Sequence, residues 1–216
     1  LREYTRSLNP GSDTPSPPST ATPSVPSTAP TEEESVTASD VSVYLAFRCT
    51  DGDSLSDLLD ALDVKSARAV FFLTPQVLEK QGDLVRRTLG QGHSVGLLAQ
   101  GDTADQTRLL LERGNELLAG TAHSRTTLAM VPDDQRAALS AQGWVCWQQT
   151  LALSPTLSSG VNTFAANTLR RLNRLNRQTV YLTMDADPGA VRVLPTLLRQ
   201  MKNNHYLIRI PMETRL

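Results

Sequence analysis

Apolar stretches with strand and helix periodicity alternate along residues 41–210, and this alternation limits the chain to a narrow set of folds. The predicted strands are 41–47, 67–74, 93–98, 126–131, 144–149, 179–184 and 205–210. The predicted helices are 54–63, 75–90, 103–118, 132–141, 164–176 and 188–203. Strands that alternate with helices of such lengths are parallel and joined by right-handed crossovers. We therefore predict an α/β fold of about seven βα units, either a small or incomplete barrel or an open doubly wound sheet.

Residues 1–40 differ in composition from the rest of the chain. Between Pro10 and Pro30, seven residues are proline and nine are serine or threonine. Such a stretch buries too little apolar surface to offset the entropy of ordering it, and proline makes it a semi-stiff spacer. We predict a disordered linker or stalk over 1–40, typical of extracellular proteins, followed by one folded domain over 41–216. A disordered cytosolic tail is the alternative.

Composition excludes several classes of protein. With 21 basic and 22 acidic residues and a net charge of -1, the chain has no bulk field that favours nucleic acid or an acidic membrane. No apolar run reaches the roughly 18 residues of a membrane span. Two cysteines are too few for a zinc ribbon or a disulfide-rich miniprotein. The sequence starts without methionine, so we expect an upstream signal peptide or anchor to have been trimmed.

Six segments carry a resemblance to a known family. VYLAFRCTDG, LLDALDVKSARAVFFLT and DLVRRTLGQGHSVG follow one another over residues 41–102, and TVYLTM, PTLLRQMK and NHYLIRI lie near the end. In order and spacing they resemble the polysaccharide deacetylase, or NodB-homology, domain of carbohydrate esterases. The resemblance implies a distorted (β/α) barrel of about seven parallel strands, with its site at the carboxyl ends of the strands.

The resemblance also implies a chemistry, and this chain departs from it. Enzymes of the family are metal-dependent hydrolases that remove acetyl groups from N-acetylated sugars. One aspartate acts as base, a second aspartate and two histidines hold a zinc-like metal, and a late histidine acts as acid. The base and metal aspartates fall on Arg48 and Cys49, the two histidines on Leu98 and Asp102, and the acid on Met184. A guanidinium cannot accept a proton, and leucine and methionine supply neither a ligand of this kind nor a proton.

These replacements predict a catalytically inactive domain without a metal cofactor. We expect it to be extracellular or associated with the bacterial cell envelope, and to bind a cell-wall glycan or an envelope protein. A purely structural module is a further possibility. The alternative is a hydrolase with a site rebuilt from Asp51, Asp102 and Asp185, together with Asp53 and Asp187 at the same strand ends. Such an oxygen-rich set suits calcium or magnesium, although aspartates in these turns also cap helices, as Asp102 would.

Cys49 is open to two interpretations. As a thiol at a strand end beside Arg48 it is a candidate nucleophile, although no histidine is obviously placed to act as its base. The interpretation that we favour is a disulfide with Cys146, which lies on another predicted strand.

Trp144, Trp147 and Tyr44 are the large aromatic residues of the predicted domain that we consider for sugar stacking. Because strand side chains alternate between two faces, we expect at least half of them to belong to the core.

The three histidines, His93, His123 and His205, have no partner at metal-ligand spacing. We expect structural or surface roles for them, with His93 at the start of a strand. The basic stretch 170–177 lacks interleaved aromatics and is predicted to be a solvated outer helix.

Overall fold

Residues 40–211, which are the residues that the computed structural model describes, form strands and helices that alternate except at two places, where one helix follows another and one strand follows another. The strands are β1 (Val41–Cys49), β2 (Val70–Leu73), β3 (Ser94–Leu98), β4 (Leu128–Met130), β5 (Val145–Cys146), β6 (Leu151–Leu153), β7 (Thr179–Asp185) and β8 (Tyr206–Arg209). The helices are α1 (Leu55–Val64), α2 (Pro75–Lys80), α3 (Gly82–Gly90), α4 (Ala104–Ala122), α5 (Arg136–Ala141), α6 (Val161–Leu175) and α7 (Pro188–Asn203). Except for Asp40, the predicted linker lies outside the described residues and stays a prediction.

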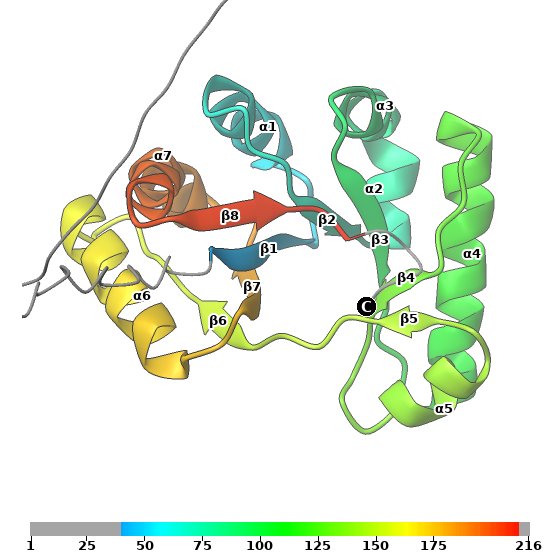
Figure 1. Cartoon of the computed structure of the whole chain (residues 1–216). Helices are drawn as coiled ribbons and strands as arrows, with labels where there is room; N and C mark the ends of the chain where they lie inside the picture. The colour runs from blue at the N-terminus through cyan, green and yellow to red at the C-terminus, as the bar shows by residue number, and fades with distance from the viewer. Residues whose placement is uncertain (1–39, 212–216) are drawn as a thin grey trace, which may run out of the picture. The chain divides into compact units, whose positions relative to one another are not determined.

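All of these strands belong to one sheet in which every pair is parallel. The order is β5-β4-β3-β2-β1-β7-β6, and β8 lies beside β1. One flank of β1 is shared, because Val41 to Tyr44 pair with β8 and Ala46 to Cys49 pair with β2. The sheet curls into part of a barrel, with the helices in an arc outside it (Figure 1).

The barrel is open on one side. Within residues 40–211 no strand pairing joins β5 to β6, and residues 147–150 run from one to the other (Figure 1). We call this opening the seam. The predicted distorted barrel of about seven parallel strands is confirmed, because seven strands form the continuous order and the eighth, β8, adds to one flank of β1.

The two faces of the curled sheet have different neighbours, as the alternation of strand side chains requires. On β1, Val43, Leu45 and Phe47 pack into the large core between the sheet and the helices. Ala46 and the partly buried Tyr44 belong to a smaller apolar cluster on the inner face. The parity of a residue along its strand therefore decides whether its side chain can reach the inside of the barrel.

Two local features differ from the sequence prediction. The helix expected over 75–90 is broken at Gln81 into α2 and α3. The start of α3 lies close to α4, since a Cβ atom on Gly82 would be 3.2 Å from Thr121 Cγ2. The strand β6 was not predicted because three residues beside a polar loop give too short a pattern to detect.

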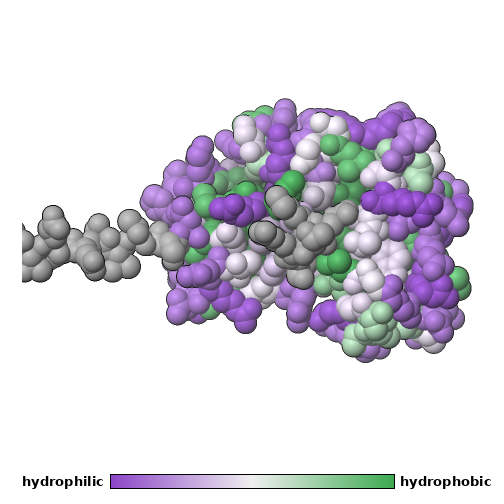
Figure 2. All heavy atoms as spheres, turned by 45° about the vertical axis from the view of Figure 1, so that its right-hand side comes forward, coloured by the Kyte–Doolittle hydropathy of each residue, from purple (hydrophilic) through white to green (hydrophobic). Residues whose placement is uncertain are grey.

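Exposed apolar side chains are few and come from separate parts of the fold. The large ones are Val64, Leu109, Leu110, Leu157, Leu207 and Ile210. On the face shown in Figure 2, hydrophobic and hydrophilic residues are interspersed. Within residues 40–211 no helix has both the length and the apolar character that crossing a membrane requires.

Candidate functional site

The carboxyl ends of parallel strands lie at one edge of the sheet, and in α/β folds ligands bind at this edge. We call it the rim. Arg48 and Cys49 end β1, Leu98 ends β3, and Asp185 ends β7. The predicted site residues therefore lie where the resemblance placed them along the chain. The directions of their side chains differ.

Arg48 forms an ion pair with Asp185 at the rim. The two residues are register partners on the neighbouring strands β1 and β7, and Arg48 Nε lies 2.8 Å from Asp185 Oδ1. The Nε–H group is not directed at the carboxylate, so the contact is electrostatic and has no hydrogen bond at this atom. The two side chains are 36% and 51% exposed, and solvent screening keeps the contribution of the pair to stability small. The pair holds the Arg48 guanidinium at the end of β1, beside its counter-charge on β7.

Cys49 points away from the inside of the barrel. Its side chain is fully buried in the core beneath the helices, on the same face as Phe47. Burial raises the pKa of the Cys49 thiol above its ordinary value, and the nearby carboxylates of Asp51 and Asp185 raise it further. A thiol that stays protonated and inaccessible is no nucleophile, so this interpretation of Cys49 is wrong.

The predicted disulfide between Cys49 and Cys146 is also wrong. Both residues are free cysteines. Cys49 lies on β1 and Cys146 on β5, and three strands of the sheet separate them. A disulfide needs Cα atoms within about 7 Å, whereas neighbouring strands alone are about 4.8 Å apart.

We therefore expect the two thiols to differ in reactivity. Cys146 is partly exposed and should react with a thiol reagent in the native protein, whereas Cys49 should react only after unfolding. Counting the labelled thiols with and without denaturant, in the wild type and in Cys146→Ser, measures this difference. A Cys49–Cys146 cross-linked peptide in a non-reducing digest would contradict the structure.

Asp102 lies in the loop that joins β3 to α4. It is exposed, and its backbone N–H donates to Gln106 Oε1 at 2.9 Å. The cap of α4 is Thr103, whose side chain accepts from the N–H of Gln106, so Asp102 is not the N-cap residue. Leu98, which precedes this loop, is partly buried and packs in the inner apolar cluster.

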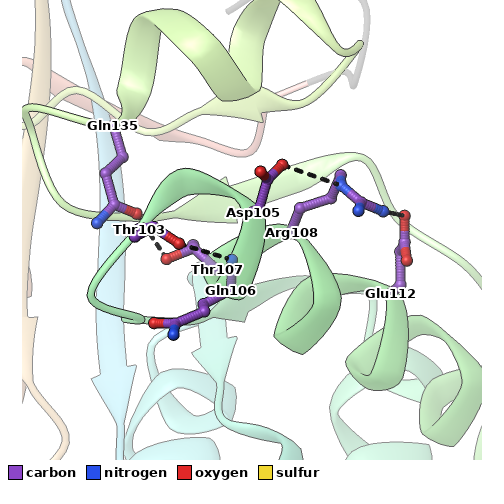
Figure 3. Close-up of polar contacts among 7 residues, drawn as sticks. All are labelled: Thr103, Asp105, Gln106, Thr107, Arg108, Glu112 and Gln135. Carbon is purple, nitrogen blue, oxygen red and sulfur yellow. Dashed lines mark hydrogen bonds and ion pairs between the residues drawn. The ribbon is translucent and has the colours of Figure 1, made fainter.

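A closed hydrogen-bond network that the sequence did not reveal holds the same loop. Gly101 N–H donates to Thr107 Oγ1 at 2.8 Å, and Thr107 Oγ1 donates to Gln135 Oε1 at 2.6 Å. Gln135 Nε2 donates back to the Gly101 carbonyl at 2.8 Å. Figure 3 shows Thr107 and Gln135 facing each other, with Arg108 between Asp105 and Glu112 on the same helix. This pair comes together only because α5 packs near the start of α4, so no pattern in the sequence predicts the contact.

The other predicted rim residues are buried in the core or make local contacts that stabilise the fold. Met184 is fully buried and belongs to the core beneath the helices, so it does not reach the inside of the barrel. Asp185, one residue later, takes the inner position at the end of β7. Asp51 is exposed and its Oδ1 accepts from the N–H of Asp53, and Asp187 caps α7 by accepting from Ala190.

The residues present do not fit the zinc-like metal that the family resemblance implies. In the part of the chain that the structure describes, no three His, Cys, Asp or Glu side chains converge to hold a metal ion. Asp51, Asp102 and Asp185 therefore do not form the shared site predicted as an alternative. The side chain of Asp185 is already engaged by a cation, Arg48.

Aromatic side chains fill the inner face of the barrel. Trp147 is 4% exposed and makes edge contacts with the rings of Phe72 and Tyr181, at centroid distances of 5.4 and 5.2 Å. Its Nε1–H donates to Thr183 Oγ1 at 2.9 Å. Tyr44 stacks on Tyr181 at 5.2 Å. Trp147 is therefore core, in agreement with the expectation that part of the aromatic set is structural.

His93 lies at the opposite end of the sheet from the rim, directly before β3. It is 4% exposed, and its Nδ1 accepts from the N–H of Ala69 at 3.2 Å. Burial, with the neighbouring Arg68 acting in the same direction, lowers the pKa of His93 to about 4. The predicted structural role of His93 is confirmed. His123 and His205 are both exposed, as surface histidines would be.

Comparison of structures finds proteins similar to this chain, whereas comparison of sequences finds none. No sequence-family profile matches the chain, and no curated protein matches it. A polysaccharide deacetylase from Bacillus cereus superposes with a TM-score of 0.65 and 20% identity, over 81% of this chain and 93% of the deacetylase. The catalytic domain of a peptidoglycan N-acetylglucosamine deacetylase from Eubacterium rectale superposes with a TM-score of 0.68 and 14% identity, over 84% and 93%.

A third similar structure is a mutant of a CE4-family pseudoenzyme with restored enzymatic activity. It superposes with a TM-score of 0.65 and 15% identity, over 78% of this chain and 65% of its own. These similarities confirm the fold that the motifs over residues 41–102 implied.

Proposed function

Because this chain has the fold of the polysaccharide deacetylases, we propose that it is a deacetylase-like domain that does not deacetylate and that binds glycan at the bacterial cell envelope. One observation carries the first half of the proposal. At the end of β1, where the family's reaction needs carboxylates, Arg48 forms an ion pair with Asp185. The guanidinium repels a metal cation and cannot accept a proton from water.

The remaining parts of such a site are changed together. Cys49 and Met184 are buried in the core beneath the helices, and Leu98 packs in an apolar cluster. The parts of an active site act as a unit, and loss of one member removes most of the rate. Loss of the base, the acid and at least one ligand together therefore supports an inactive domain. A pseudoenzyme among the similar structures is a precedent for the same fold without the reaction.

Glycan binding and a location at the cell envelope are supported by the similar structures and by the composition of the chain, and not by the rim residues. The similar structures include deacetylases of polysaccharide and of peptidoglycan, so the fold is one that holds glycans in other proteins. The composition of residues 10–30 is that of extracellular stalks. An envelope protein is the other partner that we consider, and no specific observation favours it.

The test of inactivity is metal binding and acetate release by the purified protein. Zinc, cobalt, manganese and calcium are titrated in turn by calorimetry, and N-acetylglucosamine oligomers and peptidoglycan fragments serve as substrates. We expect neither stoichiometric binding of a metal nor release of acetate. Tight metal binding that Asp51→Ala or Asp102→Ala abolishes, while Asp63→Ala leaves it intact, would overturn the proposal. Asp63 is a matched control because it is an exposed aspartate in the last turn of α1, at the end of the domain opposite to the rim.

A further inference from the structure

A polar cavity lies along the seam. Its volume is about 550 Å³, and it is lined by residues of α5, by the segment that joins β5 to β6, by the end of α6 and by Tyr181 of β7. Tyr181 precedes Asp185 by four residues on the same strand, and at about 3.3 Å per residue their Cα atoms are about 13 Å apart. Neither Arg48 nor Asp185 lines the cavity.

The charge of the cavity is positive. Arg136 lines it from α5 and Arg177 from the segment that follows α6, and none of the described lining residues is acidic. Arg177 is exposed and forms no ion pair with any residue in 40–211. Arg136 is paired with the exposed Asp133, and its Nε–H is buried without an acceptor. Two guanidinium groups without a lining carboxylate favour an anion, because the arginine fork fits carboxylate and phosphate groups.

The rest of the lining suits a sugar. Gln148 and Gln149 are exposed amides, and Ser140 contributes a hydroxyl group, so donors and acceptors for sugar hydroxyls surround the cationic groups. Tyr181 lines the cavity as well, and its ring packs against Tyr44 and Trp147. A cavity of this size also matches ordinary small-molecule sites.

We propose that the seam cavity binds an anionic sugar unit of a glycan, with Arg136 and Arg177 contacting its carboxylate or phosphate. The inference rests on the proposed glycan-binding function and names the class of sugar and the place where it binds. None of the predicted rim positions, Arg48, Cys49, Leu98, Asp102 and Met184, lines the cavity. The site therefore does not depend on the residues that the family's chemistry would need.

Direct titration of oligosaccharides tests the proposal. Three probes are titrated into the full chain by calorimetry: a neutral N-acetylglucosamine hexamer, a glucuronate-containing oligosaccharide and a glycerol-phosphate oligomer. We expect one of the two anionic probes to bind. Which of them binds shows whether the cavity recognises a carboxylate or a phosphate group. Arg177→Gln should weaken that binding about 10- to 100-fold, the usual effect of losing a charge-assisted hydrogen bond. Asp133→Asn frees Arg136 from its ion pair and should leave the affinity unchanged or raise it.

Arg174→Gln is the matched control, because Arg174 is an exposed arginine of α6 that does not line the cavity. Equal weakening by Arg174→Gln and Arg177→Gln would show attraction by bulk charge and overturn the inference. Binding of the neutral hexamer alone, unchanged by Arg177→Gln, would also overturn it and leave the proposed glycan-binding function standing. Binding of no probe would count against both, whereas release of acetate would count against the proposed function only.

Discussion

Replacing Trp147 by alanine is expected to lower the free energy of unfolding by about 3–5 kcal/mol. The indole is 4% exposed and fills the space between Phe72 of β2 and Tyr181 of β7, so its removal leaves a cavity on the inner face of the barrel. The change also removes the partner of Thr183, whose hydroxyl group is fully buried. Urea unfolding of wild type and variant at neutral pH, followed by circular dichroism, measures the difference.

Two further variants divide this effect into its parts. Trp147→Phe keeps an aromatic ring but removes the Nε1–H donor, and should cost about 1–2 kcal/mol. Trp144→Phe is the control, because Trp144 is partly buried at the edge of the other core cluster and the change is expected to cost less than about 1.5 kcal/mol. A loss in Trp147→Ala no larger than that in Trp144→Phe would show that Trp147 does not fill the barrel.

The position of Trp147 bears directly on function. A ring that is engaged on two sides by Phe72 and Tyr181 cannot also stack on a sugar at the rim. The inner face of this barrel is instead closed by apolar and aromatic packing that begins directly below the Arg48–Asp185 pair.

Periodicity was enough to predict the parallel α/β class, and the family resemblance selected the barrel over the open sheet. Long amphipathic helices such as α4 and α7 have repeating apolar positions and clear boundaries, and β1 and β7 are continuous apolar strands. The features that were missed are local and short. The strand β6 has three residues, and the break at Gln81 depends on the approach of α3 to α4. Neither feature produces a repeating apolar pattern that could be detected in a single sequence.

The strand ends could be predicted from the sequence, but the directions of the side chains there could not. Motif spacing placed Cys49, Met184 and Asp185 at strand ends, yet the face to which each side chain points depends on the pleat of the strand. One residue of difference sends Met184 into the core and Asp185 to Arg48. Arg48 can pair with Asp185 only because β1 and β7 are neighbours in the sheet. The order of the strands along the chain does not predict that these two lie side by side.

Lowering the pH from 7 to 4 is expected to cost the domain about 3 kcal/mol through His93 alone. Burial lowers the pKa of His93 from the ordinary 6.5 to about 4, with Arg68 and Arg87 acting in the same direction and Asp63 opposing them. Between these two pH values the unfolded chain binds a proton at this residue and the folded chain does not. Stability from this residue is therefore complete above about pH 6.5 and is lost as the pH falls toward 4.

The variant His93→Asn isolates this effect from the titration of carboxylates. Asparagine retains an acceptor near the position of Nδ1 for the N–H of Ala69 but does not titrate, so its stability should fall less between pH 7 and 4 than that of the wild type. His123→Asn is the matched control, since His123 is exposed and has a left-handed backbone conformation that asparagine tolerates. Urea unfolding of the three proteins at both pH values gives the comparison. Parallel losses in the wild type and His93→Asn would show that the acid sensitivity arises elsewhere, because only a buried neutral imidazole makes the two curves diverge.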